Sequence, residues 1–259
     1  MKCYIVDAFT DKPFKGNPAA VCPVEGFPTD DLMRAIAMEN NLSETAYLVN
    51  KGPGLYDLRW FTPGGEIDLC GHATLASAYV VFRFLEPQTR RVDFDTQSGR
   101  LTVTRRGDLL EMDLPAYDLT PVAVTDDMEQ AMGVRPEAAF MGRDLLCVLP
   151  AAKNVRALKP DLDRVKALPG LLLQVTAPGE EGFDCISRTF GPKLDLVEDP
   201  VCGSGHCHIV PYWLNRLGKG QLTALQASPR TGVLHCRRKG GRVFLAGQAA
   251  LYSIAELMI

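Results

Sequence analysis

Two long apolar runs, His72 to Leu85 and Ile209 to Leu217, dominate the pattern of hydrophobic and polar positions along the chain. Both are nonpolar nearly all round, and a helix that is apolar on every side belongs inside a domain rather than on its surface. A Cys-Gly pair stands just ahead of each run, at Cys70-Gly71 and Cys202-Gly203. We therefore predict two buried helices that open from Cys-Gly turns. Free N–H groups and the positive dipole end suit such an N-terminus to an anion, so we expect one small anionic ligand held between the two halves.

The segments around both runs have the alternating pattern that is typical of strands. In the first half we predict a helix from Thr29 or Asp30 to about Glu39, and strands at 4–9, 19–22, 45–49, 56–61, 91–95, 100–104 and 109–114. In the second half we predict strands at 145–149, 171–176, 184–190, 222–227, 233–237 and 242–246. Many strands wrapping one apolar helix in each half predict an α+β protein of two domains with a cleft between them.

The two halves repeat the same landmarks at nearly one offset. Cys202 follows Cys70 by 132 positions, and the segment 188–192 follows its counterpart 59–63 by 129. Similar segments at a fixed offset are typical of an internal repeat. We therefore interpret the chain as a duplication. The predicted domains are residues 1–115 with 248–259, and residues 116–247.

Composition excludes several classes of function. With 259 residues, 46% of them hydrophobic, the chain can bury one large or two medium cores. Its formal net charge of −3 gives no electrostatic case for nucleic acid or an anionic membrane. No apolar run reaches the roughly 18 residues that span a bilayer. The start of the chain looks like a strand and not a signal peptide, and eight cysteines without such a signal indicate reduced thiols in the cytoplasm.

Two acidic residues are candidates for chemistry. Glu44 precedes a predicted strand and has no acidic counterpart in the second half, where Leu168-Pro169-Gly170 stands. Asp199 lies three residues before Cys202. Both also have an ordinary interpretation, Glu44 as a solvated side chain and Asp199 as a cap of the second buried helix. A carboxyl group whose pKa is raised by a dry cleft can accept a carbon-bound proton and then return it.

Five motifs, in order, resemble the signatures of the PhzF-like family, named for a phenazine-biosynthesis isomerase that shares its fold with diaminopimelate epimerase. They are Gly16–Val21, Ser43–Ala46, Arg59–Pro63, Glu66–Thr74 and Glu198–Ser204. The resemblance implies two similar domains, each a curved, barrel-like sheet around a central helix, with the active site between them. It also implies a homodimer without a cofactor or a metal.

The resemblance assigns roles by position. In the phenazine enzyme a glutamate moves a proton between carbons of a cyclic carboxylate, and its motif matches Glu44 here. The substrate-holding His, Asp and Ser match His72, Asp199 and Ser204, so a ligand that touches all three would bridge the two domains. Gly71 and Gly203 let the backbone approach a substrate carboxylate closely. The predicted function is a cofactor-independent isomerase of a small carboxylic acid.

Three alternatives stay open. Cys70 and Cys202 occupy the positions of an epimerase thiol pair, and the helix N-terminus beside each would lower the pKa of its thiol toward the thiolate form. Both cysteines are also consistent with buried packing positions. Cys202 and His206 are four residues apart and with Cys70 and His72 are a conceivable Zn²⁺ set. A non-catalytic protein that binds a small acid is the third alternative.

Overall fold

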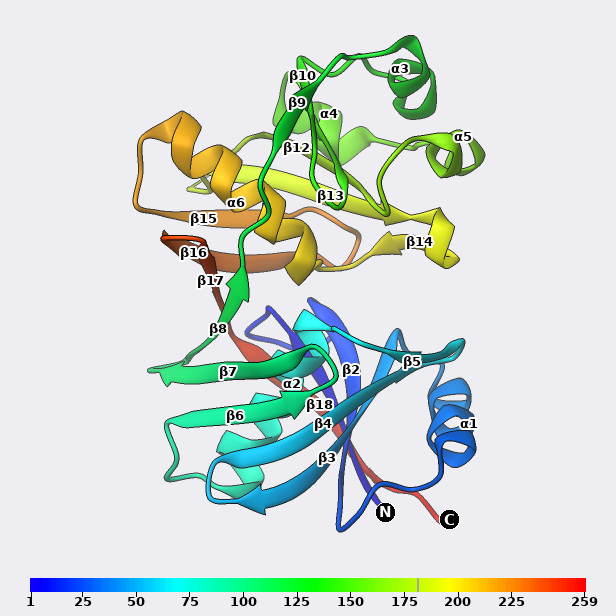
Figure 1. The fold of residues 1–259 in the computed structure, drawn as a ribbon, viewed down its shortest axis with the longest axis vertical. Coiled ribbons are helices and arrows are strands. Elements are labelled where there is room, and N and C mark those ends of the chain that lie inside the picture. Colours follow the sequence, from blue (N-terminus) through cyan, green and yellow to red (C-terminus); the bar gives the residue numbers. More distant parts are fainter. Residues whose placement is uncertain (181) are drawn as a thin grey trace. The chain divides into compact units, whose positions relative to one another are not determined.

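A computed structural model describes residues 1–180 and 182–259 of the chain, which adopt a mixed α/β fold with a large mixed sheet (Figure 1). The chain divides into two compact units. The first unit is Met1–Asp113 together with Ala246–Ile259, and the second is Leu114–Leu245. No helix in the described residues is long and apolar enough to cross a membrane.

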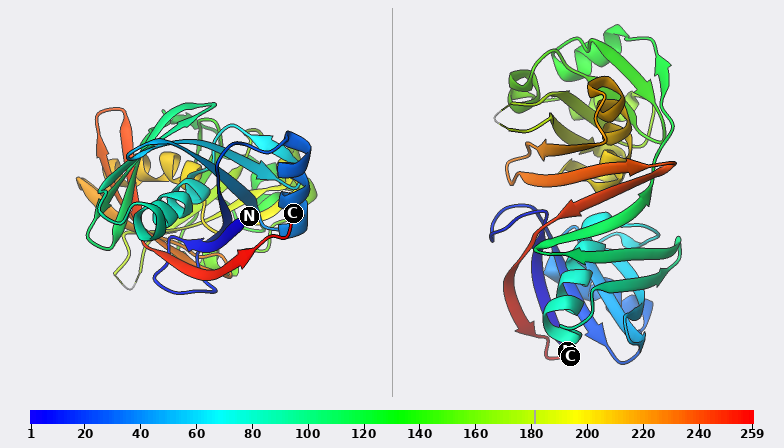
Figure 2. Two further views of the ribbon diagram at one scale, coloured as in Figure 1. Left: turned by 90° about the horizontal axis from the view of Figure 1, so that it is seen from below. Right: turned by 90° about the vertical axis from the view of Figure 1, so that its left-hand side faces the viewer.

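The first unit is a set of strands around one buried helix. Its elements are β1 Lys2–Ala8, β2 Asn17–Val24, α1 Asp30–Asn40, β3 Glu44–Gly52, β4 Leu55–Thr62, β5 Gly65–Ile67, α2 Gly71–Val80, the π-helix Val81–Leu85, β6 Arg91–Thr96, β7 Gly99–Arg106, β8 Leu109–Pro115 and β18 Ala249–Glu256. β1 pairs antiparallel with both β2 and β18, whereas β2 and β3 are parallel. α2 packs against β1, β2, β3 and β18, and the views in Figure 2 show strands on several sides of it.

The second unit also contains several strands and one long buried helix. Its elements are β9 Thr120–Val122, α3 Asp126–Met132, β10 Ala138–Met141, β11 Leu145–Val148, α4 Ala152–Ala157, α5 Leu162–Ala167, β12 Leu173–Pro178, β13 Cys185–Gly191, the 3-10 helix Pro192–Leu194, β14 Leu196–Asp199, α6 Gly203–Leu217, β15 Gln221–Gln226, β16 Gly232–Lys239 and β17 Arg242–Gly247. β11 is parallel to β12 and β13 to β15, and the other described pairs in this unit are antiparallel. α6 packs against β12, β15 and β16.

Both predicted buried helices are confirmed, together with their starting residues. Cys70 and Cys202 are the N-caps of α2 and α6, and both have extended backbone. Most residues of each helix are buried. The first helix differs from the prediction at its end, because α2 gives way at Val81 to a π-helical turn, closed by the Glu86 N–H donating to the Val81 carbonyl at 2.7 Å.

A matching ion pair lies ahead of each of the two helices. Arg59 on β4 contacts Glu66 on β5 through two bonds of 2.7 Å, and Arg188 on β13 contacts Glu198 on β14 at 2.7 and 2.8 Å. Each guanidinium carbon also lies about 5 Å above the ring of the phenylalanine two residues along, at 5.1 and 5.0 Å. Such two-pronged arginine–carboxylate pairs fix geometry as well as adding energy. They hold the short strand that leads into each Cys-capped turn.

The short elements β5, β9, β10, β14, α3, α4 and α5 were not predicted. They contain three to seven residues each. A segment of that length offers too few positions for an apolar period of 2 or 3.6 to stand out.

Candidate active site

Glu44, Cys70 and His72 meet at the start of α2 in the first unit. Glu44 begins β3 and Asn17 begins the parallel neighbour β2, so both side chains lie at the same edge of the sheet. The Nε2 atom of His72 lies 2.9 Å from Oε2 of Glu44, and its Nδ1 atom lies 3.5 Å from the Cys70 sulfur. Because the side chain of Glu44 is only 13% exposed, it is not the solvated surface carboxylate of the ordinary interpretation.

The side chain of Asn17 orients the His72 ring. Its Nδ2 atom lies 3.1 Å from Nδ1 of His72, and both residues are buried. An amide can present a donor or an acceptor, so Asn17 can match Nδ1 of His72 in the neutral and in the protonated state. Either arrangement leaves Nε2 of His72 directed at the Glu44 carboxylate.

The electrostatics of this cluster favour a charged pair. Burial lowers the pKa of His72, but the Cys70 and Glu44 side chains raise it by more, so the net shift is well upward. Burial, and then the Glu44 charge, raise the pKa of the Cys70 thiol, and the neighbouring His72 offsets part of that rise. The net upward shift favours the protonated form of His72 in this cluster.

The raised pKa of His72 makes a prediction about stability. A histidine whose folded-state pKa is raised contributes stability that is complete below its unfolded pKa of about 6.5 and is lost as the pH rises through the folded value. We expect the difference in unfolding free energy between the wild type and His72→Gln to be largest below about pH 6.5 and to shrink at alkaline pH. Urea unfolding across this pH range measures it, with His235→Gln at an exposed site as the control. A difference that grows with pH would contradict the pairing.

Cys202, Ser204 and Asp199 gather at the start of α6 in the second unit. The Cys202 sulfur accepts the Gly205 N–H at 3.3 Å and lies 3.4 Å from the Ser204 hydroxyl. Asp199 ends β14, and its Oδ1 accepts the Val201 N–H at 3.1 Å. Asp199 thus stabilises the turn that leads into α6, while the helix cap itself is Cys202.

The surroundings of both cysteines oppose the thiolate that the epimerase alternative requires. Burial, followed by the Asp199 charge, raises the pKa of Cys202 well above its usual value, as burial does for Cys70. Loss of hydration disfavours the anion, and here that cost outweighs the helix N-terminus. The raised pKa favours the neutral thiol at both positions.

The zinc set built on Cys202 and His206 does not form as expected. The Nδ1 atom of His206 lies 2.7 Å from the Cys202 carbonyl oxygen, and its Nε2 atom faces the Ser187 hydroxyl at 3.5 Å. Burial lowers the pKa of His206 to about 4, so this histidine is a neutral core residue. In the described part of the chain, the group of potential metal ligands that comes together is Glu44, Cys70 and His72, with ligand atoms within 4.8 Å of one another.

Three residues of these clusters were missed from the sequence. The motif Gly16–Val21 gives Asn17 no role, and no pattern in the sequence marks Gln226 or Arg143. The Gln226 side chain accepts the Cys202 N–H at 2.8 Å and donates to the Asp199 carbonyl at 2.6 Å. Arg143 donates to the Ser204 hydroxyl at 2.9 Å. No spacing signal connects an arginine to a serine 61 positions later, and only the fold brings them together.

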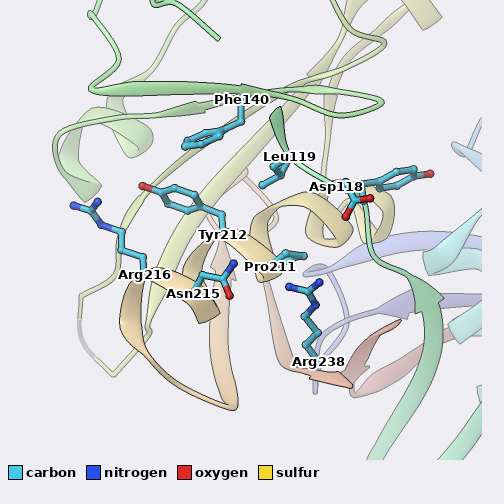
Figure 3. Close-up of a pocket in the computed structure, with 9 residues that line it drawn as sticks. Asp118, Leu119, Phe140, Pro211, Tyr212, Asn215, Arg216 and Arg238 are labelled. Carbon is cyan, nitrogen blue, oxygen red and sulfur yellow. The ribbon is translucent and has the colours of Figure 1, made fainter. Parts of the chain in front are cut away.

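A separate pocket of about 620 Å³ lies on the second unit (Figure 3). It is lined by Pro211, Tyr212, Asn215 and Arg216 of α6 and by Tyr117, Asp118, Leu119, Phe140 and Arg238. None of the predicted site residues lines it. Pro211 has no N–H for the Cys207 carbonyl one turn earlier, and that carbonyl accepts the Tyr117 N–H at 3.1 Å instead. The bond holds Tyr117 against α6, with its ring stacked on His208 at 4.3 Å.

Comparison with known proteins gives consistent matches over the whole chain. The family described as "Phenazine biosynthesis-like protein" matches residues 6–254. An uncharacterized isomerase of Pseudomonas aeruginosa is 48% identical over 97% of this chain and 96% of its own. A crystal structure of a PhzF family phenazine biosynthesis protein of Enterococcus faecalis has a TM-score of 0.97 at 45% identity, covering 100% of this chain and 99% of that one. A predicted epimerase of P. aeruginosa, at 22% identity, covers 100% of this chain and 99% of its own with a TM-score of 0.75, and so shares the fold.

Proposed function

We propose that this protein, which belongs to the phenazine biosynthesis-like (PhzC-PhzF) family, is an isomerase that moves a carbon-bound proton of a small carboxylic acid, with Glu44 as the proton shuttle. The names of its relatives support the coarser statement that it is an enzyme of the isomerase or epimerase type. One observation carries the finer statement. Oε2 of Glu44 and Nε2 of His72 are buried and 2.9 Å apart, yet neither makes an aligned hydrogen bond within the described residues.

That arrangement leaves the carboxylate available for a ligand. Buried polar atoms without aligned partners are rare and call for an explanation, and a substrate that orders the pair is one. In the proposed reaction Glu44 takes a proton from one carbon, leaving the electron pair in the conjugated substrate, and returns the proton to another carbon. The protonated His72 beside it stabilises the negative charge during the transfer. Atoms and charge balance without a cofactor.

The proposed substrate contacts are the residues that the family motifs indicate. Glu44, His72 and Gly71 belong to the first unit and Asp199, Gly203 and Ser204 to the second. Backbone N–H groups at the two Cys-capped helix starts would receive its carboxylate. The proposed domains are 1–115 with 248–259, and 116–247.

An internal duplication is proposed for the two units. The Arg59–Glu66 and Arg188–Glu198 pairs and the two cysteine N-caps support it. The barrel-like form of each sheet and the homodimer are proposed from the family resemblance.

Solvent deuterium incorporation tests the proposed reaction. The purified protein would be incubated in deuterium oxide with a panel of small cyclic and amino carboxylic acids, and mass spectrometry would detect deuterium at carbon. At least one acid should exchange or change its double-bond position. A panel without exchange or product would count against the proposal and would favour a non-catalytic acid-binding protein, although the isomerase relatives disfavour that alternative.

A two-thiol epimerase is the second candidate, because Cys70 and Cys202 stand at equivalent positions of the two units. Such an enzyme needs one thiolate and one thiol at neutral pH, whereas burial raises the pKa of both thiols. We therefore expect Cys70→Ala and Cys202→Ala each to keep turnover within about tenfold of the wild type, since neither thiol carries the transferred proton in the proposed reaction and the main cost is local packing. Activity of both variants on one substrate measures this. Abolished turnover in both would favour the epimerase.

A further inference from the structure

The loop Gly142–Asp144 between β10 and β11 lies against the first turn of α6. Nη2 of Arg143 donates to the Ser204 hydroxyl oxygen at 2.9 Å. A hydroxyl has one proton and two lone pairs, and the arginine occupies one of the lone pairs. The proton of Ser204 must then point away from Arg143. Its nearest side-chain acceptor in the described structure is the Cys202 sulfur at 3.4 Å, which is a weak acceptor.

A buried network holds Arg143 in this position. Asp144 is fully buried. Its carboxylate accepts one hydrogen bond from Nε of Arg143 at 3.1 Å and another from the Gln174 side-chain amide at 3.0 Å. The Asp144 N–H donates to Nε2 of His208 at 3.2 Å, and Nδ1 of His208 lies 3.1 Å from the Ser204 carbonyl oxygen. Burial lowers the pKa of His208, so the ring is neutral and its Nδ1 carries the proton. The ring therefore ties the arginine loop to the serine backbone.

Packing around the loop leaves little freedom. The Arg143 guanidinium lies 5.4 Å above the Tyr117 ring, which itself stacks on His208. At Gly142 an added Cβ would lie 2.7 Å from the His208 ring, so no larger residue fits without displacing it. The Asp144 side chain is 0% exposed and that of Arg143 is 32% exposed. The charge that this loop presents at its surface is therefore positive.

We propose that Arg143 is a positioning and specificity-determining residue that turns the Ser204 hydroxyl into a hydrogen-bond donor for a carboxylate of the substrate. The inference rests on the proposed function, which places Ser204 at the substrate. A carboxylate accepts the Ser204 proton far better than a thiol does, and the adjacent guanidinium disfavours a cationic group. A neutral amide of the same shape gains less, because its acceptor is an uncharged carbonyl oxygen, which forms a weaker hydrogen bond than a carboxylate does.

The test compares benzoate with benzamide, a charged and a neutral probe of nearly the same shape. Binding is measured by ligand-observed NMR titration of the wild type, Arg143→Gln, Arg143→Lys, Ser204→Ala and the Arg143→Gln/Ser204→Ala double variant. We expect Arg143→Gln to weaken benzoate about tenfold, and Arg143→Lys to weaken it less. Benzamide binding should weaken by a much smaller factor, because its carbonyl acceptor carries no charge. In the Ser204→Ala background Arg143→Gln should add little, because the arginine acts through the serine.

Each of the other outcomes would contradict a specific part of the proposal for Arg143. Additive losses in the double variant would mean that Arg143 binds the carboxylate itself. Equal losses for benzoate and benzamide would indicate a merely structural role, which thermal unfolding of Arg143→Gln would also reveal. Wild-type protein that does not prefer benzoate to benzamide would exclude a carboxylate subsite. Turnover that survives Glu44→Gln would refute the proposed shuttle and leave the carboxylate preference of the Arg143 subsite intact.

Discussion

Replacing Glu44 with glutamine is expected to lower turnover by about 10²- to 10⁴-fold, the range of general acid–base catalysis. Glutamine has the shape of glutamate but cannot accept and return a proton. The Glu44 side chain is 13% exposed and lies 2.9 Å from His72. Because glutamine occupies nearly the same volume, the substitution removes the titrating group and preserves the packing at this buried position. Steady-state turnover and deuterium incorporation at carbon, measured on one substrate, should fall together.

The matched control is Glu39→Gln, an exposed carboxylate in α1 only five positions earlier. That change should leave both rates within the error of the wild type. Substrate binding to Glu44→Gln should persist, because the shuttle acts on the reacting carbon and not on the carboxylate. Wild-type exchange and turnover in Glu44→Gln would remove Glu44 from the mechanism. If Cys70→Ala and Cys202→Ala were inactive at the same time, the two-thiol epimerase would replace our proposal.

Arg188→Met is expected to destabilise the protein by about 3–5 kcal/mol, the typical loss when one partner of a buried ion pair is removed. The side chains of Arg188 and Glu198 are 11% and 13% exposed. Nη1 of Arg188 also donates to the carbonyl oxygens of Val155 and Leu158 at 3.2 and 2.7 Å. Methionine fills a similar volume but leaves Glu198 and both carbonyls without these donors. The free energy of unfolding in urea measures the loss.

Arg135→Met provides the control for this second change. Arg135 pairs with Asp126 and Glu129, but its side chain is 50% exposed, and an exposed pair contributes about 0–1 kcal/mol. If Arg188→Met lowers the free energy of unfolding by no more than Arg135→Met does, water must hydrate the groups that Arg188 leaves without a partner. Because Glu198 stands next to Asp199 on β14, Arg188→Met should also weaken substrate binding, which would link this pair to the site.

The sequence was sufficient to predict the elements whose patterns are strong. α2 and α6 were predicted because their apolar surface extends all round, and the Cys-Gly pairs marked their first residues. The longer strands followed from alternation. Glu44 was predicted as a site residue from the asymmetry of the proposed repeat and from the family motif, and His72 from the motif alone. Neither observation from the sequence indicated that the two side chains lie 2.9 Å apart.

What followed from the sequence alone was therefore local: the identity of the buried helices, the residues that cap them and the motifs that place the chain in its family. The tertiary structure decided the contacts between residues distant in sequence and the protonation of the buried groups. Arg143 reaches Ser204 only because the β10–β11 loop folds onto α6. The pKa values of Cys70 and Cys202 are raised because burial removes water from around the sulfur. This loss of hydration destabilises the thiolate by more than the helix N-terminus stabilises it. Periodicity reports which face of an element is buried, and it carries no information about which distant side chain shares that interior.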